Sequence, residues 1–408
     1  MRDALWTSDA LIEAVDARSV GGVEALVTGI SIDSRTMKRG EAFFAIKGDR
    51  FDGHDFVTAA MERGAALAVV ADDRLDELPR SGRYVVVPDV LAALEDLGRA
   101  ARARTEARIV AVTGSVGKTS TKEMLRLAFE ACGRTHASVA SFNNHWGVPL
   151  TLARMPQATE YGVFEIGMNH PGEIESLVAM VRPHTAIITT VEAVHLEHFG
   201  SVEAIAKAKS EIFSGLEPGG VAILNADNDQ YDLLRFLAHT ASVPRVVSFG
   251  VRRDADIHLE QVVCHEDCSC ASARVLDVPV SYKIGAPGRH LVQNSLAVLG
   301  AVSLSGADLA RAMQPLARMK PPKGRGERHQ LALANGPATL IDESYNANPA
   351  SMRAAISLLG ATPIERPGRR IAVLGDMLEL GEASASLHRA LARPLEEAHV
   401  DLVYCAGR

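Results

Sequence analysis

The chain has 408 residues, of which 47% are hydrophobic and 23% charged, a composition typical of a globular protein with two or three domains. It excludes a largely disordered or fibrous chain. A total of 43 Lys and Arg against 50 Asp and Glu gives a net charge of −7, so we expect no nucleic-acid binding through overall charge.

Residues 1–83 are predicted to form a small α/β unit. A helix is expected around Ser8–Ala17, followed by strands at Glu41–Ile46 and Ala66–Val70, with Gly and Asp at the turns. The first 19 residues carry acidic side chains within their apolar stretch, unlike an export signal. Because no apolar run approaches the roughly 18 residues of a membrane span, we expect a cytoplasmic protein that does not cross a membrane.

Residues 84–318 are predicted to form a central doubly wound α/β domain. An amphipathic helix is expected over Val90–Arg104. Apolar runs then alternate with helical patterns, which indicates parallel strands joined by right-handed crossovers. These runs are Ile109–Val112, Val163–Ile166, Ala186–Val191 and Val221–Leu224.

The strongest local signal is TGSVGKTS, which follows the first of these strands. Gly114 and Gly117 free the backbone to curl round an anion, and the next helix points its unpaired amides at it. Lys118 would neutralise β- and γ-phosphates, and the Thr119 hydroxyl would bind Mg²⁺. The alternative is a purely structural strand-to-helix turn that binds no ligand. The residues expected to hold the nucleotide here are Gly114, Ser115, Val116, Gly117, Lys118, Thr119 and Ser120.

Glu165 and His195 follow two other strands of this domain. Ligands of open α/β sheets bind beyond the carboxyl ends of the strands, so both side chains are expected near the phosphate loop, where they could hold a second Mg²⁺. Taken singly, Glu165 is equally a solvated acid at a strand end, and His195 is more often a surface turn residue.

Lys209 is predicted to face inward. It lies four residues after Ile205 and seven after Val202 on an apolar helical stripe, whereas Lys207 points elsewhere. An inward ammonium costs free energy unless it is paired or neutral, which suggests an ion pair with phosphate or an amine that reacts with CO₂ to form a carbamate. A structural lysine that reaches solvent is the alternative.

Five cysteines without an export signal predict free thiols. Three of them lie in CHEDCSC, residues 264–270, where a metal knuckle is conceivable. The spacing is not CxxC and no second ligand pair follows, so a polar hairpin is the favoured interpretation.

Residues 319–408 are predicted to form a third unit after a Pro/Gly-rich linker, Met319–Gly326. Strands are expected at Thr339–Ile341 and Ile371–Leu374. Between them Asn348 and Pro349 begin a helix that Gly360 closes. The polar loop before this helix suggests ligand contacts from Asp342, Glu343, Tyr345, Asn346 and Asn348. Capping alone would explain Asn348, and turn chemistry would explain Asn346.

Ten motifs in this order resemble the Mur ligases of bacterial cell-wall synthesis, from about residue 26 to the end. They are TGSVGKTST, SFNNHWGVPLT, EIGMNHPGEI, HLEHFG, AKAKSEIF, NADND, RHLVQNSLAV, KGRGER, IDESYNANPASM and LGDMLELGE. The resemblance implies three domains: an N-terminal UDP-binding domain, a P-loop ATPase domain and a C-terminal Rossmann-like domain. Family members usually continue past the strand Asp401–Cys405, so the third domain is expected to be incomplete.

The resemblance implies a monomeric ATP-dependent ligase that joins D-alanyl-D-alanine to the terminal carboxylate of UDP-N-acetylmuramoyl-tripeptide through an acyl phosphate. The alternatives are a related ligase with another amino-acid donor and a P-loop switch that makes no bond. The implied cofactors are ATP, two Mg²⁺ ions and a carbamylated Lys209.

The family's functional residues fall on particular positions of this chain. Lys118, Glu165, His195 and Lys209 would form the catalytic set, with Thr119, Glu165, His195 and Lys209 around the metal. The other implied nucleotide contacts are Asn294, Arg325, Asp342, Tyr345, Asn346 and Asn348. The implied substrate contacts are Ser34, Arg35, Lys47, Asn143 and Asn144.

Overall fold

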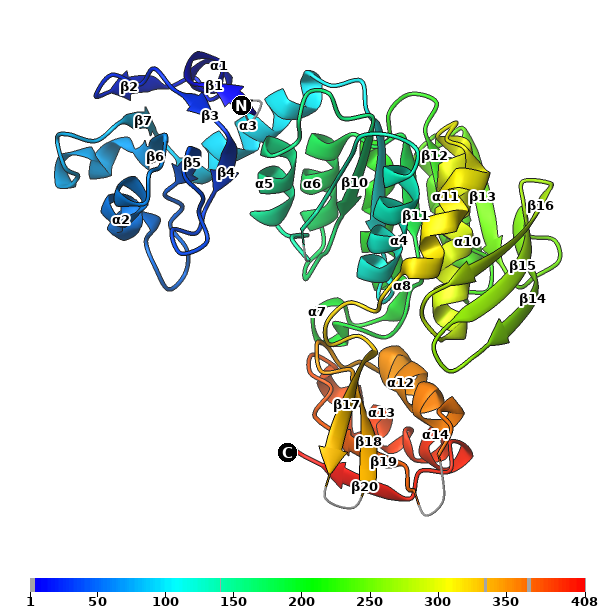
Figure 1. Cartoon of the computed structure of the whole chain (residues 1–408). Coiled ribbons are helices and arrows are strands. Elements are labelled where there is room, and N and C mark those ends of the chain that lie inside the picture. The colour runs from blue at the N-terminus through cyan, green and yellow to red at the C-terminus, as the bar shows by residue number, and fades with distance from the viewer. Residues whose placement is uncertain (1–3, 140, 334–335, 365–367, 408) are drawn as a thin grey trace.

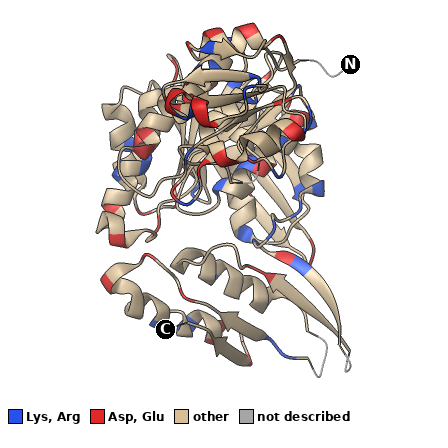
Figure 2. Ribbon diagram, turned by 90° about the vertical axis from the view of Figure 1, so that its left-hand side faces the viewer, with Lys and Arg blue, Asp and Glu red and all other residues tan. Residues whose placement is uncertain are grey.

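The computed structural model describes residues 4–139, 141–333, 336–364 and 368–407. They form an N-terminal, a central and a C-terminal unit, with the first and last attached to different sides of the central one (Figure 1). Lys and Arg are interspersed with Asp and Glu along the ribbon (Figure 2). Within the described ranges, no helix combines the length and apolar character needed to cross a membrane.

The N-terminal unit is built on a five-stranded sheet of order β2-β7-β6-β5-β4, in which only β2 runs antiparallel to its neighbour. A separate antiparallel pair joins β1 and β3. The strands are β1 Trp6–Thr7, β2 Arg18–Val20, β3 Leu26–Val27, β4 Gly29–Ser31, β5 Glu41–Phe44, β6 Leu67–Ala71 and β7 Tyr84–Val87. The helices are α1 Ser8–Ala14, η1 Gly53–Phe56, α2 Val57–Glu62 and η2 Asp72–Glu77.

Two predictions for this unit need adjustment. The expected helix Ser8–Ala17 ends at Ala14, and Asp16 is left-handed with a φ of 45°. Strand β7 begins after residue 83 and yet pairs with β6, so we place the end of the unit after Val87.

Helix α3, Val90–Ala103, joins the first two units. Asp89 caps it by accepting a hydrogen bond from the Ala92 amide. Its Leu94 and Leu97 share one apolar cluster with the N-terminal strands and with Leu150. The first two units therefore have a common core.

The central unit is a nine-stranded sheet of order β16-β15-β14-β13-β12-β11-β8-β10-β9. Pairing is parallel from β9 to β14 and antiparallel through β14, β15 and β16. The strands are β8 Arg108–Thr113, β9 Thr135–Ala137, β10 Tyr161–Glu165, β11 Thr185–Ile188, β12 Val221–Asn225, β13 Arg245–Gly250, β14 Ile257–Cys264, β15 Ser269–Val275 and β16 Val278–Ile284. The predicted parallel strands are confirmed, and the antiparallel edge is an addition.

Helices cover both faces of this sheet, which confirms the doubly wound arrangement. One face packs against α4 Lys118–Glu130, α10 Arg289–Leu304, α11 Leu309–Met313 and η4 Gln314–Arg318. The other packs against α5 Gly147–Ala153, α6 Glu173–Val181, α7 Leu196–Phe199, α8 Val202–Ser210, η3 Glu211–Gly215 and α9 Tyr231–Thr240. Since both faces are covered, the inner strands are buried and apolar.

The segment CHEDCSC forms the predicted hairpin. Strand β14 ends at Cys264, β15 begins at Ser269, and the His265 amide donates to the Cys268 carbonyl at 2.8 Å. All five cysteines are free.

The C-terminal unit holds two small sheets, antiparallel β17-β18 and parallel β19-β20. Its elements are β17 Glu327–Leu333, β18 Gly336–Asp342, α12 Pro349–Ala361, β19 Ile371–Leu374, η5 Gly381–Ala383, α13 Ser384–Arg389, α14 Ala392–Glu397 and β20 Leu402–Cys405. The expected strands at Thr339–Ile341 and Ile371–Leu374 are confirmed, as is the cap at Asn348. Gly360 lies inside α12, which ends at Ala361, and β17 was not predicted.

Candidate active site

The site is built on three neighbouring strand ends of the central sheet. β8 lies between β10 and β11, and the register sets Glu165 beside Val112 and Ile188 beside Thr113. The loop after β8 leads directly into α4, which begins at Lys118. Side chains at these ends therefore converge over the phosphate loop, as predicted.

Two glycines let the loop pass close to other groups. Gly114 has a φ of 150°, and a Cβ there would lie 1.9 Å from Oγ1 of Thr189. Gly117 has a φ of 85°, and a Cβ there would lie 2.6 Å from Nδ2 of Asn294. This places Asn294, which is buried on α10, beside the loop, while its contact with the nucleotide stays a prediction. The glycine loop also leaves the unpaired amides at the N-terminus of α4 accessible to an anion.

Lys118 is folded back over this loop. Its ammonium donates to the Gly114 carbonyl at 2.6 Å. Burial lowers the pKa of Lys118; the charge of Glu165 opposes this shift, and that of Arg325 adds to it. Arg325 thus brings a positive charge from the linker of the C-terminal unit to the phosphate loop.

Glu165 has one carboxylate oxygen in use and one without a partner. Oε1 accepts from Asn143 Nδ2 at 2.7 Å and from Thr119 Oγ1 at 3.3 Å. Oε2 is buried and has no hydrogen-bond partner among the described residues. A buried, unpartnered carboxylate oxygen beside a threonine hydroxyl is the donor set that a hard cation prefers, so these residues fit Mg²⁺.

Lys209 faces inward, as the helical periodicity predicted. It is 2% exposed, and no hydrogen bond or ion pair joins its amine to another side chain in the described ranges. Burial lowers the pKa of Lys209 well below its ordinary value, and the charge of Lys118 adds to this. Lys207 on the same helix is exposed. The arrangement favours a neutral, nucleophilic amine at Lys209.

His195 lies between this site and the C-terminal unit. It has a left-handed φ of 54° at the start of α7, and its Nδ1 pairs with Oε2 of Glu379. Burial lowers the pKa of His195, and the charges of Lys209 and Lys118 lower it further, while Glu379 opposes the shift. The structure therefore gathers Lys118, His195 and Lys209 in one place.

The polar loop of the C-terminal unit lines a cavity of about 780 Å³ that also contains His195. From this loop Asp342, Tyr345 and Asn346 reach the cavity wall. The guanidinium of Arg325 lies over the ring of Tyr345, 4.2 Å from its centroid.

Asn348 and Glu343 of the same loop have different surroundings. Asn348 is buried, accepts from the amides of Ala350 and Ser351, and is not part of the cavity wall, so its observed role is the helix cap. Glu343, which was expected to contact a ligand, lines the cavity, and burial raises its pKa to about 7.

The predicted substrate contacts divide between two units. Ser34, Arg35 and Lys47 lie in the N-terminal unit, where Arg35 is exposed and pairs with Asp33 at 2.9 Å. Asn144 accepts from the Gly147 amide at 2.9 Å. Asn143 instead orients Glu165, a role that the sequence alone did not reveal.

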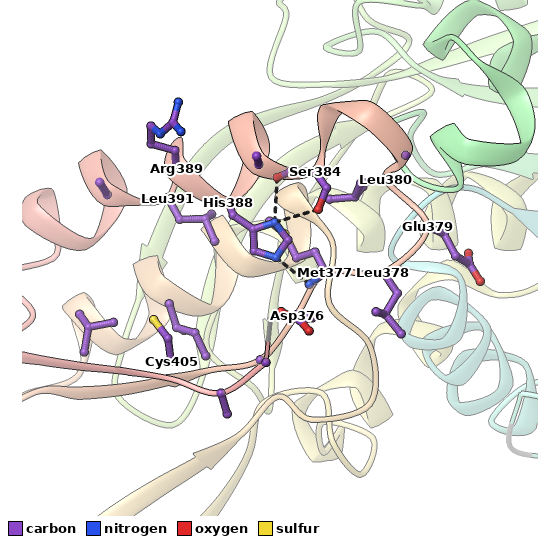
Figure 3. Close-up of a pocket in the computed structure, with 18 of the residues that line it drawn as sticks. Asp376, Met377, Leu378, Glu379, Leu380, Ser384, His388, Arg389, Leu391 and Cys405 are labelled. Atoms are coloured by element: carbon purple, nitrogen blue, oxygen red, sulfur yellow. Dashed lines mark hydrogen bonds between the residues drawn. The ribbon is translucent and has the colours of Figure 1, made fainter.

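Two other features of the C-terminal unit border this site. A cavity of about 970 Å³ contains none of the predicted site residues (Figure 3). Its His388 accepts from the Met377 amide at 2.9 Å and contacts the Ser384 carbonyl through Nδ1 at 2.8 Å, which is a structural use of both ring nitrogens. Glu327, His329 and Asp342 also lie close enough together to share an ion, on the β17-β18 hairpin.

Comparison with known proteins places this geometry in a family. The description "Mur ligase middle domain" matches residues 112–302, "Mur ligase, glutamate ligase domain" matches 324–408, and "Mur ligase family, catalytic domain" matches 26–105. The UDP-N-acetylmuramoyl-tripeptide–D-alanyl-D-alanine ligase of Escherichia coli (strain K12) is 37% identical, over 95% of this chain and 83% of its own. The ligase of the same name from Bacillus subtilis (strain 168) is 33% identical, over 94% and 81%.

Solved structures give the same result. MurF from Acinetobacter baumannii superposes with a TM-score of 0.84 at 31% identity, covering 99% of this chain and 86% of that one. MurF ligase from Thermotoga maritima, solved in complex with ADP, gives a TM-score of 0.75 at 28% identity, covering 92% and 83%.

Proposed function

The chain belongs to the Mur ligase family, and from this premise we propose that it joins D-alanyl-D-alanine to the terminal carboxylate of UDP-N-acetylmuramoyl-tripeptide at the expense of ATP. It is an ATP-dependent peptide ligase of peptidoglycan biosynthesis. The proposal rests on the relatives' shared activity and on one observation within the structure: the phosphate loop and Glu165 meet at neighbouring strand ends, and the buried Lys209 of α8 lies within reach of the charge of Lys118.

The phosphate loop supports the grip on ATP. The loop brings the amides at the start of α4 together with the Lys118 ammonium, which donates to the Gly114 carbonyl. Asn294 lies beside the loop, and Arg325 and Tyr345 stack on each other where the C-terminal unit meets it. We assign the triphosphate to Gly114–Ser120 and the nucleoside to the Asn294 side, closed over by Arg325.

For the cation, we propose Thr119, Glu165 and His195 as the protein ligands, with two Mg²⁺ ions in the complete site. When bound, Mg²⁺ supplies positive charge that offsets the charge of the phosphates. The free Oε2 of Glu165 is the strongest support, because a buried carboxylate oxygen without a partner is costly unless a ligand completes it.

We propose that the amine of Lys209 is carbamylated. A neutral amine nitrogen attacks the carbon of CO₂, one C–O π bond becomes a lone pair on oxygen, and the nitrogen loses a proton to solvent. The product is an anionic oxygen ligand in place of a buried amine. Addition of ¹³C-bicarbonate should give a carbamate ¹³C signal in the wild-type chain that is absent from Lys209→Ala, and a wild-type chain without that signal would rule the carbamate out.

The chemistry needs an activated acid because a carboxylate does not react with an amine at neutral pH. The tripeptide carboxylate oxygen attacks the γ-phosphorus, the bond to the ADP oxygen breaks, and an acyl phosphate forms. The amine of D-alanyl-D-alanine attacks the acyl carbon, phosphate leaves with its electron pair, and the nitrogen loses a proton. Lys118 and Arg325 stabilise charge on the transferred group by position.

The test is a panel of amine donors assayed with the full chain, ATP, Mg²⁺ and UDP-N-acetylmuramoyl-tripeptide. We expect phosphate release and a new amide product, identified by mass, with D-alanyl-D-alanine. An amide product formed with a different amino acid would show that D-alanyl-D-alanine is not the donor. ATP hydrolysis without any amine would favour a nucleotide switch. Sedimentation of the same sample tests the proposed monomer.

A further inference from the structure

We infer that Glu379 of the C-terminal unit is a positioning residue for His195, so that the cation site of the central unit is complete only while the two units are in contact. The inference rests on the proposed function, since it takes His195 to be a ligand of the cation that accompanies ATP. Glu379 itself does not touch substrate or metal in this scheme.

The contact between the two side chains fixes which nitrogen of His195 is available. Oε2 of Glu379 pairs with Nδ1 of His195. A carboxylate only accepts hydrogen bonds, so Nδ1 carries the proton and the lone pair lies on Nε2. A histidine that binds a metal usually donates its other ring N–H to a carboxylate or carbonyl, which sets both tautomer and ring orientation.

The backbone reinforces this contact. His195 and Glu379 both have left-handed conformations, with φ values of 54° and 60°, which residues other than glycine adopt rarely. The Glu197 amide also donates to the Glu379 carbonyl at 3.1 Å. Helix α7 lies where the central unit meets the C-terminal unit (Figure 1). The strain and the double contact indicate that this pairing is held by the surrounding structure.

A second link between the units separates docking from positioning. Arg353 on α12 lies 3.6 Å from Glu192, three residues before His195, and touches none of the proposed ligands. Removing Arg353 therefore weakens docking without touching the imidazole. Glu382, an exposed acid near Glu379 on the same segment, gives a control for charge alone.

The experiment measures binding of Mn²⁺ by electron paramagnetic resonance to the full chain saturated with a non-hydrolysable ATP analogue. We expect Glu379→Ala to raise the Kd for Mn²⁺ by about tenfold, which is typical of losing such a partner. Glu379→Gln should stay within about twofold of the wild type, because its amide oxygen still accepts from Nδ1. Arg353→Ala should raise the Kd by much less than Glu379→Ala does, because it weakens docking but leaves the imidazole its partner, and Glu382→Gln should match the wild type.

Three results would overturn the inference: an unchanged Kd in Glu379→Ala, an equal loss in Arg353→Ala, or a loss in Glu379→Gln as large as in Glu379→Ala. The tautomer gives a separate readout, since ¹⁵N-histidine NMR should show protonated Nδ1 at His195 in the wild type and in Glu379→Gln, but not in Glu379→Ala. His195→Gln assigns the signal.

Failure of the proposed function would look different. If the wild-type chain binds Mn²⁺ and nucleotide but makes no amide product, the ligase assignment fails, while the comparison of Kd values among the variants still judges Glu379. If ligation proceeds and all Kd values agree, only the role of Glu379 is lost.

Discussion

The central and C-terminal units meet at one site but are built in opposite ways. The central sheet is covered on both faces, and its Thr119, Glu165 and Lys209 are at most 5% exposed. The C-terminal unit has a small buried cluster, and its strands leave Val373 73% and Tyr404 58% exposed. Strands β19 and β20 contain no charged residue.

This difference separates two tasks. A Lys209 amine with a lowered pKa and an unpartnered Glu165 oxygen persist only where water is excluded and the surroundings are rigid. Arg325, Arg353 and Glu379 instead reach the site as polar contacts from a unit with few buried neighbours, which is what a part that opens and closes requires. The buried chemistry belongs to the central unit, and the reversible contacts belong to the C-terminal unit.

The largest effect should come from the buried lysine. Lys209→Ala is expected to lower the rate of ligation by about 10²-fold or more, equivalent to about 2.7 kcal/mol, because it removes the proposed carbamate from the site. Lys207→Ala, two residues away and exposed, should keep the wild-type rate. Phosphate release at saturating substrate concentrations measures the rates of both variants. Equal rates would contradict a chemical role for Lys209.

Next in size is Gly114→Ala. Its Cβ would lie 1.9 Å from Oγ1 of Thr189, which donates to the Val116 carbonyl at 2.6 Å, so the phosphate loop must shift. We expect a loss of roughly 2–3 kcal/mol in the free energy of unfolding and weakened ATP binding.

The matched control for Gly114→Ala is Gly219→Ala. Gly219 also has a positive φ, 82°, but it lies on an exposed turn with no atom within 4 Å of the added Cβ. It should lose roughly 1 kcal/mol from backbone strain alone and bind ATP normally. Urea unfolding measures the stability of both variants, and nucleotide titration measures their affinity for ATP. If Gly114→Ala binds ATP as tightly as the control, ATP binding does not need the close approach of the loop to Thr189.

The features that the sequence predicted correctly are those set by residues close together in the chain. The phosphate loop and the inward face of Lys209 depend on residues within about two helical turns, so spacing was enough. Strands β8, β10, β11 and β12 are buried on both faces and therefore appear as continuous apolar runs.

What the sequence did not predict depends on distant or weak signals. The partner of His195 lies 184 residues away, and no periodicity connects them. Strand β15, Ser269–Val275, buries only alternate small residues, so its apolar signal is faint. Strands β5 and β6 of the N-terminal unit overlap the expected runs Glu41–Ile46 and Ala66–Val70, but the other strands of this unit contain two to four residues, too few for a reliable pattern. Only the structure shows that Asn143 orients Glu165. The sequence does not distinguish an asparagine that binds a substrate from one that holds a carboxylate in place.

A smaller effect should distinguish the two units by pH. Burial lowers the pKa of His136 in β9 to about 4, so the folded central unit binds fewer protons than the unfolded chain, and its stability falls as pH drops from 6.5 towards 4. Burial raises the pKa of Glu343 to about 7, so the C-terminal unit loses stability as pH rises from 4.5 to 7. A shift of this size corresponds to roughly 3 kcal/mol over the full pH range, so each group should change the stability by roughly 1–2 kcal/mol between pH values about 1.5 units apart.

Two variants isolate these opposite slopes. His136→Gln should flatten the loss on acidification, and Glu343→Gln should flatten the loss between pH 4.5 and 7, since neither amide titrates. Thermal unfolding at pH 4.5, 6 and 7.5 provides the measurement. Identical pH profiles in both variants and the wild type would mean that neither group is desolvated as the structure indicates.

The smallest effect should come from Arg353→Ala at the contact between the units. The ion pair with Glu192 is half-exposed on the arginine side, and such pairs contribute about 1 kcal/mol or less. Because the pair holds the C-terminal unit near the site without touching the reacting groups, KM for the dipeptide should rise by about two- to fivefold, with kcat nearly unchanged. Steady-state kinetics at varied dipeptide concentration separates the two constants. A fall in kcat comparable to that of Lys209→Ala would show that the C-terminal unit takes part in the chemistry itself, and the division of tasks between the two units would then be wrong.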